Sequence, residues 1–101
     1  YGKAIALYLK NEGFTLLAVD FNPDEVRRWR KRGHQVMYGD ASDPVFVSGL
    51  PLNGVKWVVS ALPQHEFGLT HEDPRLSLIE GLKQQQYAGH IAVSTQKPHE
   101  Q

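Results

Sequence analysis

The sequence contains no cysteine, which excludes disulfide bonds, thiolate catalysis and cysteine-based metal sites. It also lacks an apolar run near the roughly 20 residues that span a bilayer, so no membrane-spanning helix is predicted. Eleven basic and eleven acidic residues leave no net charge. Binders of nucleic acids and membrane surfaces usually carry a net basic face, so this balance argues against both classes.

The 101 residues are enough for one domain and leave no room for a second core. Hydrophobic residues make up 41% of the chain and charged residues 22%, as in ordinary globular proteins. The chain opens at Tyr1 without a charged-then-apolar leader, in what the pattern predicts to be the first turn of a helix. We therefore expect a piece of a longer protein.

Four segments carry helix signals, which are apolar residues three or four positions apart, capping residues and terminal glycines. Asn22-Pro23 and Asp43-Pro44 are both a capping residue followed by a proline at the first helical position. The predicted helices cover residues 2–11, 23–32, 44–50 and 74–86. The apolar face of the last helix is expected to consist of Leu76, Ile79 and Leu82.

Four short apolar runs alternate with these helices, at residues 15–20, 35–38, 56–60 and 90–94. Nearly continuous apolar runs are typical of strands that are buried on both faces. Strict alternation of helices and strands predicts a parallel sheet with right-handed crossovers and helices on both faces. The predicted fold class is therefore α/β, a Rossmann-like doubly wound sheet.

Chemistry-bearing residues fall at the ends of consecutive predicted strands. A dinucleotide site needs a glycine turn at a helix N-terminus, where free N–H groups hold the pyrophosphate. It also needs an acidic residue about 20 positions later that accepts hydrogen bonds from the ribose hydroxyls. Gly2 and Asp20 fit the third glycine and the acid. The first two glycines and the first β-strand would then precede Tyr1, so we expect that strand to be missing from this chain.

Five stretches of the sequence match one family pattern: 1–9, 19–26, 33–36, 39–44 and 58–63. The Gly39-Asp40-Ala41-Ser42 block, in register with Val19-Asp20, is the most specific of them. On these residues the chain, from Tyr1 to about Thr95, resembles the nucleotide-binding N-terminal lobe of RCK domains, also called KTN or TrkA-N domains. The predicted domain covers residues 1–95, and 96–101 is expected to be a polar tail.

The resemblance implies a role for each matching position. Asp20 would bind the adenosine ribose with its neighbours Phe21 and Asn22, and Asp40 and Ala41 would line the adenine pocket. Positions near the ribose and phosphates would be Gly2, Ser60, Ala61 and Leu62. The expected cofactor is NAD(H), with AMP, ADP or ATP as alternatives, because a carboxylate at Asp20 would repel the 2′-phosphate of NADP(H).

The resemblance also implies a regulatory domain of potassium channels, potassium uptake systems or cation:proton antiporters. Its expected partners are a second copy, in a homodimer or higher oligomer, and a membrane cation transporter at whose cytoplasmic side the domain would lie. We expect no enzyme, because the chain has no Tyr-x-x-x-Lys pattern and no Gly-x-Ser-x-Gly elbow. Two alternatives stay open: the cofactor-binding half of an NAD-dependent oxidoreductase, and an interaction module with a vestigial site.

Several of these residues also have a simpler, purely structural interpretation. Asp20 could be a turn aspartate before Pro23, and Asp40 could cap the helix that begins near Pro44. The arginine-rich segment 27–32 is typical of an exposed helix face. Both tryptophans are most simply interpreted as core residues. A loop cluster lacks the spacing of a metal site, so no metal is expected there: His65, Glu66, His71, Glu72 and Asp73.

Overall fold

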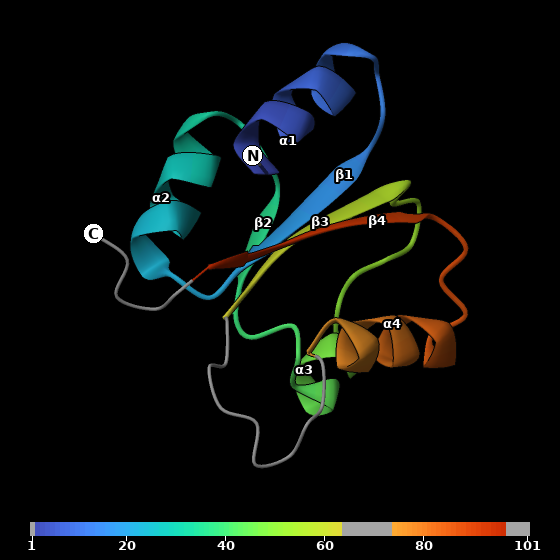
Figure 1. Cartoon of the computed structure of the whole chain (residues 1–101). Coiled ribbons are helices and arrows are strands. Elements are labelled where there is room, and N and C mark those ends of the chain that lie inside the picture. The colour runs from blue at the N-terminus through green and yellow to red at the C-terminus, as the bar shows by residue number, and fades with distance from the viewer. Residues whose placement is uncertain (1, 64–73, 97–101) are drawn as a thin grey trace.

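The computed structural model describes residues 2–63 and 74–96. Helices and strands alternate strictly along this part of the chain (Figure 1). The helices are α1 (Gly2–Asn11), α2 (Pro23–Lys31), α3 (Pro44–Ser48) and α4 (Pro74–Gln84). The strands are β1 (Leu16–Asp20), β2 (Val36–Tyr38), β3 (Trp57–Pro63) and β4 (His90–Gln96).

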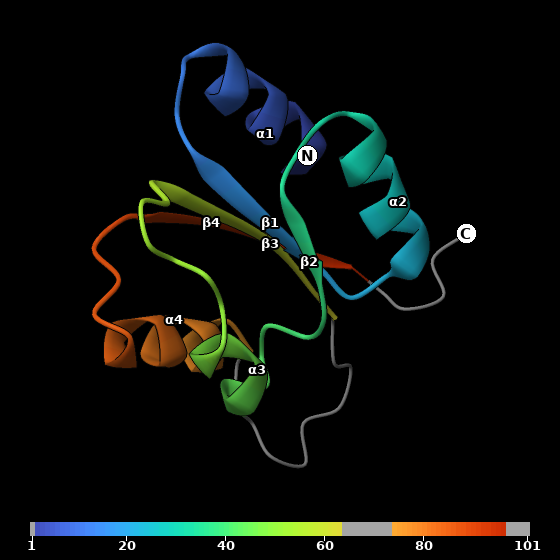
Figure 2. The same ribbon diagram turned by 180° about the vertical axis from the view of Figure 1, so that it is seen from behind.

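The strands form one parallel sheet in the order β2-β1-β3-β4. Helices α1 and α2 cover one face, and α3 and α4 cover the other (Figures 1 and 2). The α/β fold with a parallel sheet and helices on both faces is thus confirmed. In a doubly wound sheet of order 3-2-1-4-5, these strands correspond to the second to fifth. With no first strand between them, β1 and β3 pair directly, from Leu16 beside Trp57 to Val19 beside Ser60.

Each face of the sheet has its own apolar core, because successive side chains of a strand point to opposite faces. In β1, Leu17 and Val19 pack in the core under α3 and α4. Leu16 and Ala18 pack in the core under α1 and α2. A strand that is buried along its whole length, as β1 is, accounts for the continuous apolar run in the sequence.

The prediction of which α4 residues face the core is wrong in part. Leu82 is buried as expected, but Leu76 is 64% exposed and Ile79 37% exposed, whereas Leu78 is fully buried. The helix turns its Gly81 side toward α3, where an added Cβ would lie 2.8 Å from a methyl carbon of Val47. The glycine lets the two helices approach closely, and this contact sets which side of α4 faces inward.

Candidate functional site

Asp20 and Asp40 lie at the same edge of the sheet. Asp20 ends β1 and pairs with Tyr38, the last residue of β2. The backbone N–H of Gly39 donates to the carbonyl oxygen of Asp20 at 3.0 Å. Since Asp40 follows immediately, the two acidic residues sit on neighbouring loops at the carboxyl ends of adjacent parallel strands.

The same edge holds the switch point of the sheet. The chain moves from β1 outward to β2, and then returns across β1 to add β3 and β4 on the other side. Open α/β sheets bind ligands at the carboxyl ends of strands where the order reverses in this way. Val19 pairs with Ser60, so Asp20 is level with Ala61 across the switch point. The candidate residues at the ends of β1, β2 and β3 therefore lie at the same edge of the sheet, around the switch point.

The Asp20 carboxylate is buried and accepts hydrogen bonds from the turn after β1 and from α2. Asp20 is only 2% exposed. Oδ1 accepts a hydrogen bond from the backbone N–H of Asn22 at 3.0 Å, and Oδ2 accepts one from Trp29 Nε1 at 3.2 Å. A carboxylate offers about four acceptor positions, so these two bonds do not by themselves preclude a hydrogen bond from a ribose hydroxyl.

Asn22 organises the turn that follows Asp20. Its side-chain oxygen accepts the N–H of Asp24 at 2.9 Å, so it is the N-cap of α2, with Pro23 in the first turn. Its own backbone N–H fixes Asp20, which is thus also a turn aspartate as the simpler interpretation proposed. Phe21 and Asn22 are half-buried. The turn role and a ligand role do not compete, because the turn uses only part of the carboxylate.

Asp40 shapes the loop between β2 and α3. Its Oδ1 accepts the backbone N–H of Ser42 at 2.9 Å and the hydroxyl of Ser42 at 2.6 Å. Asp43 and not Asp40 caps α3, since its Oδ1 accepts the N–H of Val45 at 3.0 Å. Gly39 lets the loop pass close to Phe46, whose ring would have to shift to admit an added Cβ. Through these bonds to Ser42, the half-buried Asp40 carboxylate stabilises its own loop.

The remaining candidates differ in burial. Ala41 and Leu62 are fully buried in the core under α3 and α4, and Ala61 is 7% exposed. Ser60 is 2% exposed, and its hydroxyl has no hydrogen-bond partner in the part of the chain that the structure describes. Ala41 and Leu62 can therefore shape the site through packing, whereas Ser60 brings an unused hydroxyl next to the switch point.

Gly2 begins α1, the helix that leads into β1. Because α1 runs back antiparallel to β1, its first turn points toward the carboxyl edge of the sheet (Figure 1). A helix N-terminus carries free N–H groups and partial positive charge, which suits an anion. The elements that would hold a ribose and a phosphate thus converge on one edge.

Two contacts at the candidate site go beyond what the sequence pattern indicates. Trp29 was interpreted as a core residue, which it is at 4% exposure, but its indole N–H also reaches Asp20. His34 packs edge-on against the Trp29 ring, with centroids 5.3 Å apart. The sequence signals neither contact, apart from the ring nitrogen that each side chain carries.

His34 should make the fold less stable in mild acid. Burial, with smaller contributions from Lys10 and Arg32, lowers its pKa from 6.5. Below pH 6.5 the unfolded chain binds a proton that the folded chain binds less well. The stability is therefore full above that pH, falls as the pH drops from 6.5 toward the lowered pKa, and levels off below it. Urea denaturation between about pH 7.5 and 5.5 measures this loss. His34→Gln should remove part of this pH dependence, and a His34→Gln variant with the slope of the wild type would contradict this account.

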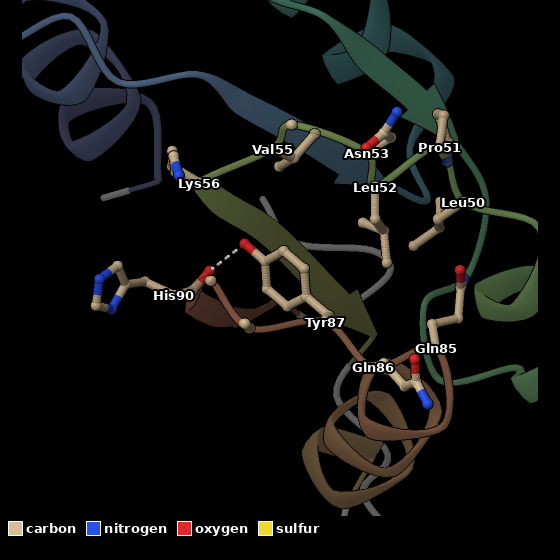
Figure 3. Close-up of a pocket in the computed structure, with 13 residues that line it drawn as sticks. Leu50, Pro51, Leu52, Asn53, Val55, Lys56, Gln85, Gln86, Tyr87 and His90 are labelled. Carbon is tan, nitrogen blue, oxygen red and sulfur yellow. Dashed lines mark hydrogen bonds between the residues drawn. The ribbon is translucent and has the colours of Figure 1, made fainter.

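A cavity of about 790 Å³ lies at the opposite, amino edge of the sheet. The connections that precede β3 and β4 line it, and Lys56, Tyr87 and His90 are among the lining residues (Figure 3). The Tyr87 hydroxyl donates to the carbonyl oxygen of His90 at 3.0 Å, and burial raises the pKa of Tyr87. This cavity shares no residue with the candidate site, so it provides an internal comparison for binding experiments.

Residues 2–63 and 74–96 contain no cluster of three metal-ligating side chains and no helix long and apolar enough to cross a membrane. The acidic and histidine-rich loop cluster at positions 65–73 lies outside the described residues.

Comparison with known protein families gives a match over most of the chain. Residues 1–71 match the family described as the TrkA-N domain. This range includes α1 to β3 and every candidate site residue. No curated protein and no solved structure gives a significant match to the chain.

Proposed function

Because this chain belongs to the TrkA-N domain family, a nucleotide-binding Rossmann-type fold, we propose that it binds NAD(H) and regulates the transport of potassium or another monovalent cation. AMP, ADP and ATP share the adenosine group and are the alternative ligands. The observation that carries the proposal is the buried Asp20 carboxylate at the switch point, next to the Asp40 loop.

Asp20 suits a ribose on chemical grounds. An ionised carboxylate only accepts hydrogen bonds, and the two hydroxyls of a ribose are donors. Its place at the end of the strand after the glycine helix is that of the ribose acid in dinucleotide-binding folds. A 2′-phosphate would bring a second negative charge to this carboxylate, so NAD(H) should be preferred over NADP(H).

The other elements supply the remaining groups. The first turn of α1, beginning at Gly2, would face the phosphates with its free N–H groups. The Asp40-Ala41 loop would border the adenine, and Ser60 would offer its hydroxyl to the ribose or phosphates. These assignments follow the family pattern at positions that the fold brings to one edge.

The burial of Asp20 supports a regulatory role. A ribose reaches a side chain of 2% exposure only if neighbouring groups at this edge move apart. Ligand binding would thus favour an open arrangement of α1, α2 and the β2–α3 loop over the closed one. In this proposal, a second copy of the domain and a cation transporter or antiporter respond to the change. The domain would lie at the cytoplasmic side of that transporter. No chemical step on the nucleotide is part of the proposal.

Thermal denaturation with separate additions of NAD, NADP, ATP and AMP tests this function. A ligand at about 100 times its dissociation constant stabilises the fold by about 2.7 kcal/mol. NAD should raise the melting temperature clearly and NADP should raise it less at equal concentration.

The other outcomes are equally informative. No shift with any of the four ligands would contradict nucleotide binding and favour an interaction module with a vestigial site. A shift accompanied by substrate-dependent hydride transfer would instead favour the cofactor-binding half of an oxidoreductase.

A further inference from the structure

The indole of Trp29 joins the inner face of α2 to the candidate ribose site. Its ring packs in the core under α1 and α2, beside Val26 and Val36. Its only polar atom, Nε1, donates to Oδ2 of Asp20 at 3.2 Å. A Trp N–H that leaves water needs a partner, and here that partner is the carboxylate at the switch point.

Two donors from different elements fix the plane of this carboxylate. The backbone of Asn22, in the turn after β1, holds Oδ1, and α2 holds Oδ2 through Trp29. Each donor restrains rotation of the carboxylate about its Cβ–Cγ bond. Together these donors restrain the orientation of the carboxylate, and a fixed orientation favours binding to the two hydroxyls of a ribose.

The indole is itself held in place. His34 meets it edge-on, with centroids 5.3 Å apart and an interplanar angle of 71°. Since His34 is 7% exposed and Trp29 is 4% exposed, neither ring can turn without disturbing the core. The position of the carboxylate is thus tied to the packing of α2 against the sheet.

We propose that Trp29 is a positioning residue for Asp20 and thereby determines the selectivity of this site for a ribose diol. The proposal rests on the proposed function and deepens it. Phenylalanine would fill most of the same apolar space without the N–H donor. The role of the donor can therefore be separated from that of the ring.

Calorimetric titration with AMP and with 2′-deoxy-AMP tests this role in the wild type, Trp29→Phe and Trp57→Phe. Trp57 is the matched control, because it lies at the amino end of β3 and its ring contacts His90. We expect the wild type to bind AMP about tenfold more tightly than 2′-deoxy-AMP, the value of one good hydrogen bond. Trp29→Phe should weaken AMP binding about tenfold and bring the ratio of the two affinities toward one. Trp57→Phe should leave that ratio unchanged.

The experiment distinguishes a failure of the proposed function from a failure of the positioning role of Trp29. A wild type that binds neither ligand would overturn the proposed function and this inference with it. A wild type that prefers AMP, with Trp29→Phe keeping the full preference, would overturn the positioning role alone.

A second measurement does not depend on the stability of the Trp29→Phe variant. In the ¹⁵N-labelled wild type, AMP should shift the indole N–H resonance of Trp29 and leave that of Trp57 in place. The Trp57→Phe spectrum assigns the two signals, since the chain has two tryptophans. A Trp29 resonance that does not move when AMP binds would contradict the proposal.

Discussion

Replacing Asp20 with alanine is expected to weaken NAD(H) binding by about 100-fold. Two hydrogen bonds from ribose hydroxyls to a charged acceptor contribute about 3 kcal/mol together, which corresponds to that factor. The substitution also removes the charge that should reject a 2′-phosphate, so the preference for NAD over NADP should decrease. Calorimetric titration of both dinucleotides at one ionic strength measures both effects.

Asp43→Ala is the matched control for Asp20→Ala. It removes the same charge from a nearby loop, where Asp43 caps α3. The lost cap should cost about 1 kcal/mol of folding stability and leave the affinity for NAD(H) within about twofold. Asp20→Asn, which keeps the shape of the side chain, checks that the effect does not come from a cavity. Equal affinities for Asp20→Ala and Asp43→Ala would contradict the ribose role of Asp20.

Leu17→Ala should have the largest effect on stability, a loss of about 2–5 kcal/mol from the free energy of unfolding. Leu17 is fully buried in the middle of β1, where it packs in the core under α3 and α4. Truncation there removes apolar contacts and leaves a cavity that the strand cannot close, because β2 and β3 hold it on both sides. Urea denaturation of the variant measures the loss.

Leu7→Ala is the same substitution at an exposed position of α1. Leu7 is 56% exposed, so its truncation should change the free energy of unfolding by no more than about 0.5 kcal/mol. A loss of similar size in both variants would mean that β1 does not occupy the centre of the sheet.

The sequence predicts much of this fold because its signals are local. Asn22-Pro23 and Asp43-Pro44 begin helices by capping them, and the structure has both caps. The alternation of apolar runs with helices leads directly to the parallel sheet. The placement of Asp20 and Asp40 at one edge of the sheet follows as well, since consecutive parallel strands that pair bring their carboxyl ends together.

Features that depend on distant contacts could not be predicted. The side of α4 that faces inward depends on the close approach of Gly81 to Val47, and spacing along α4 alone favoured Leu76 and Ile79. The contact of Trp29 with Asp20 depends on how α2 lies across β1, so the sequence indicated only a core tryptophan. Direct pairing of β1 with β3 is likewise a property of the assembled sheet.

Mapping the backbone amide resonances of the ¹⁵N-labelled protein during a titration with NAD tests the central claim most directly. We predict that the largest shifts occur at the carboxyl edge of the sheet, at Phe21, Asn22, Asp40, Ala41 and Ala61. Shifts confined to the amino-edge cavity, around Lys56 and Tyr87, would show that the nucleotide binds elsewhere and would contradict the assigned site.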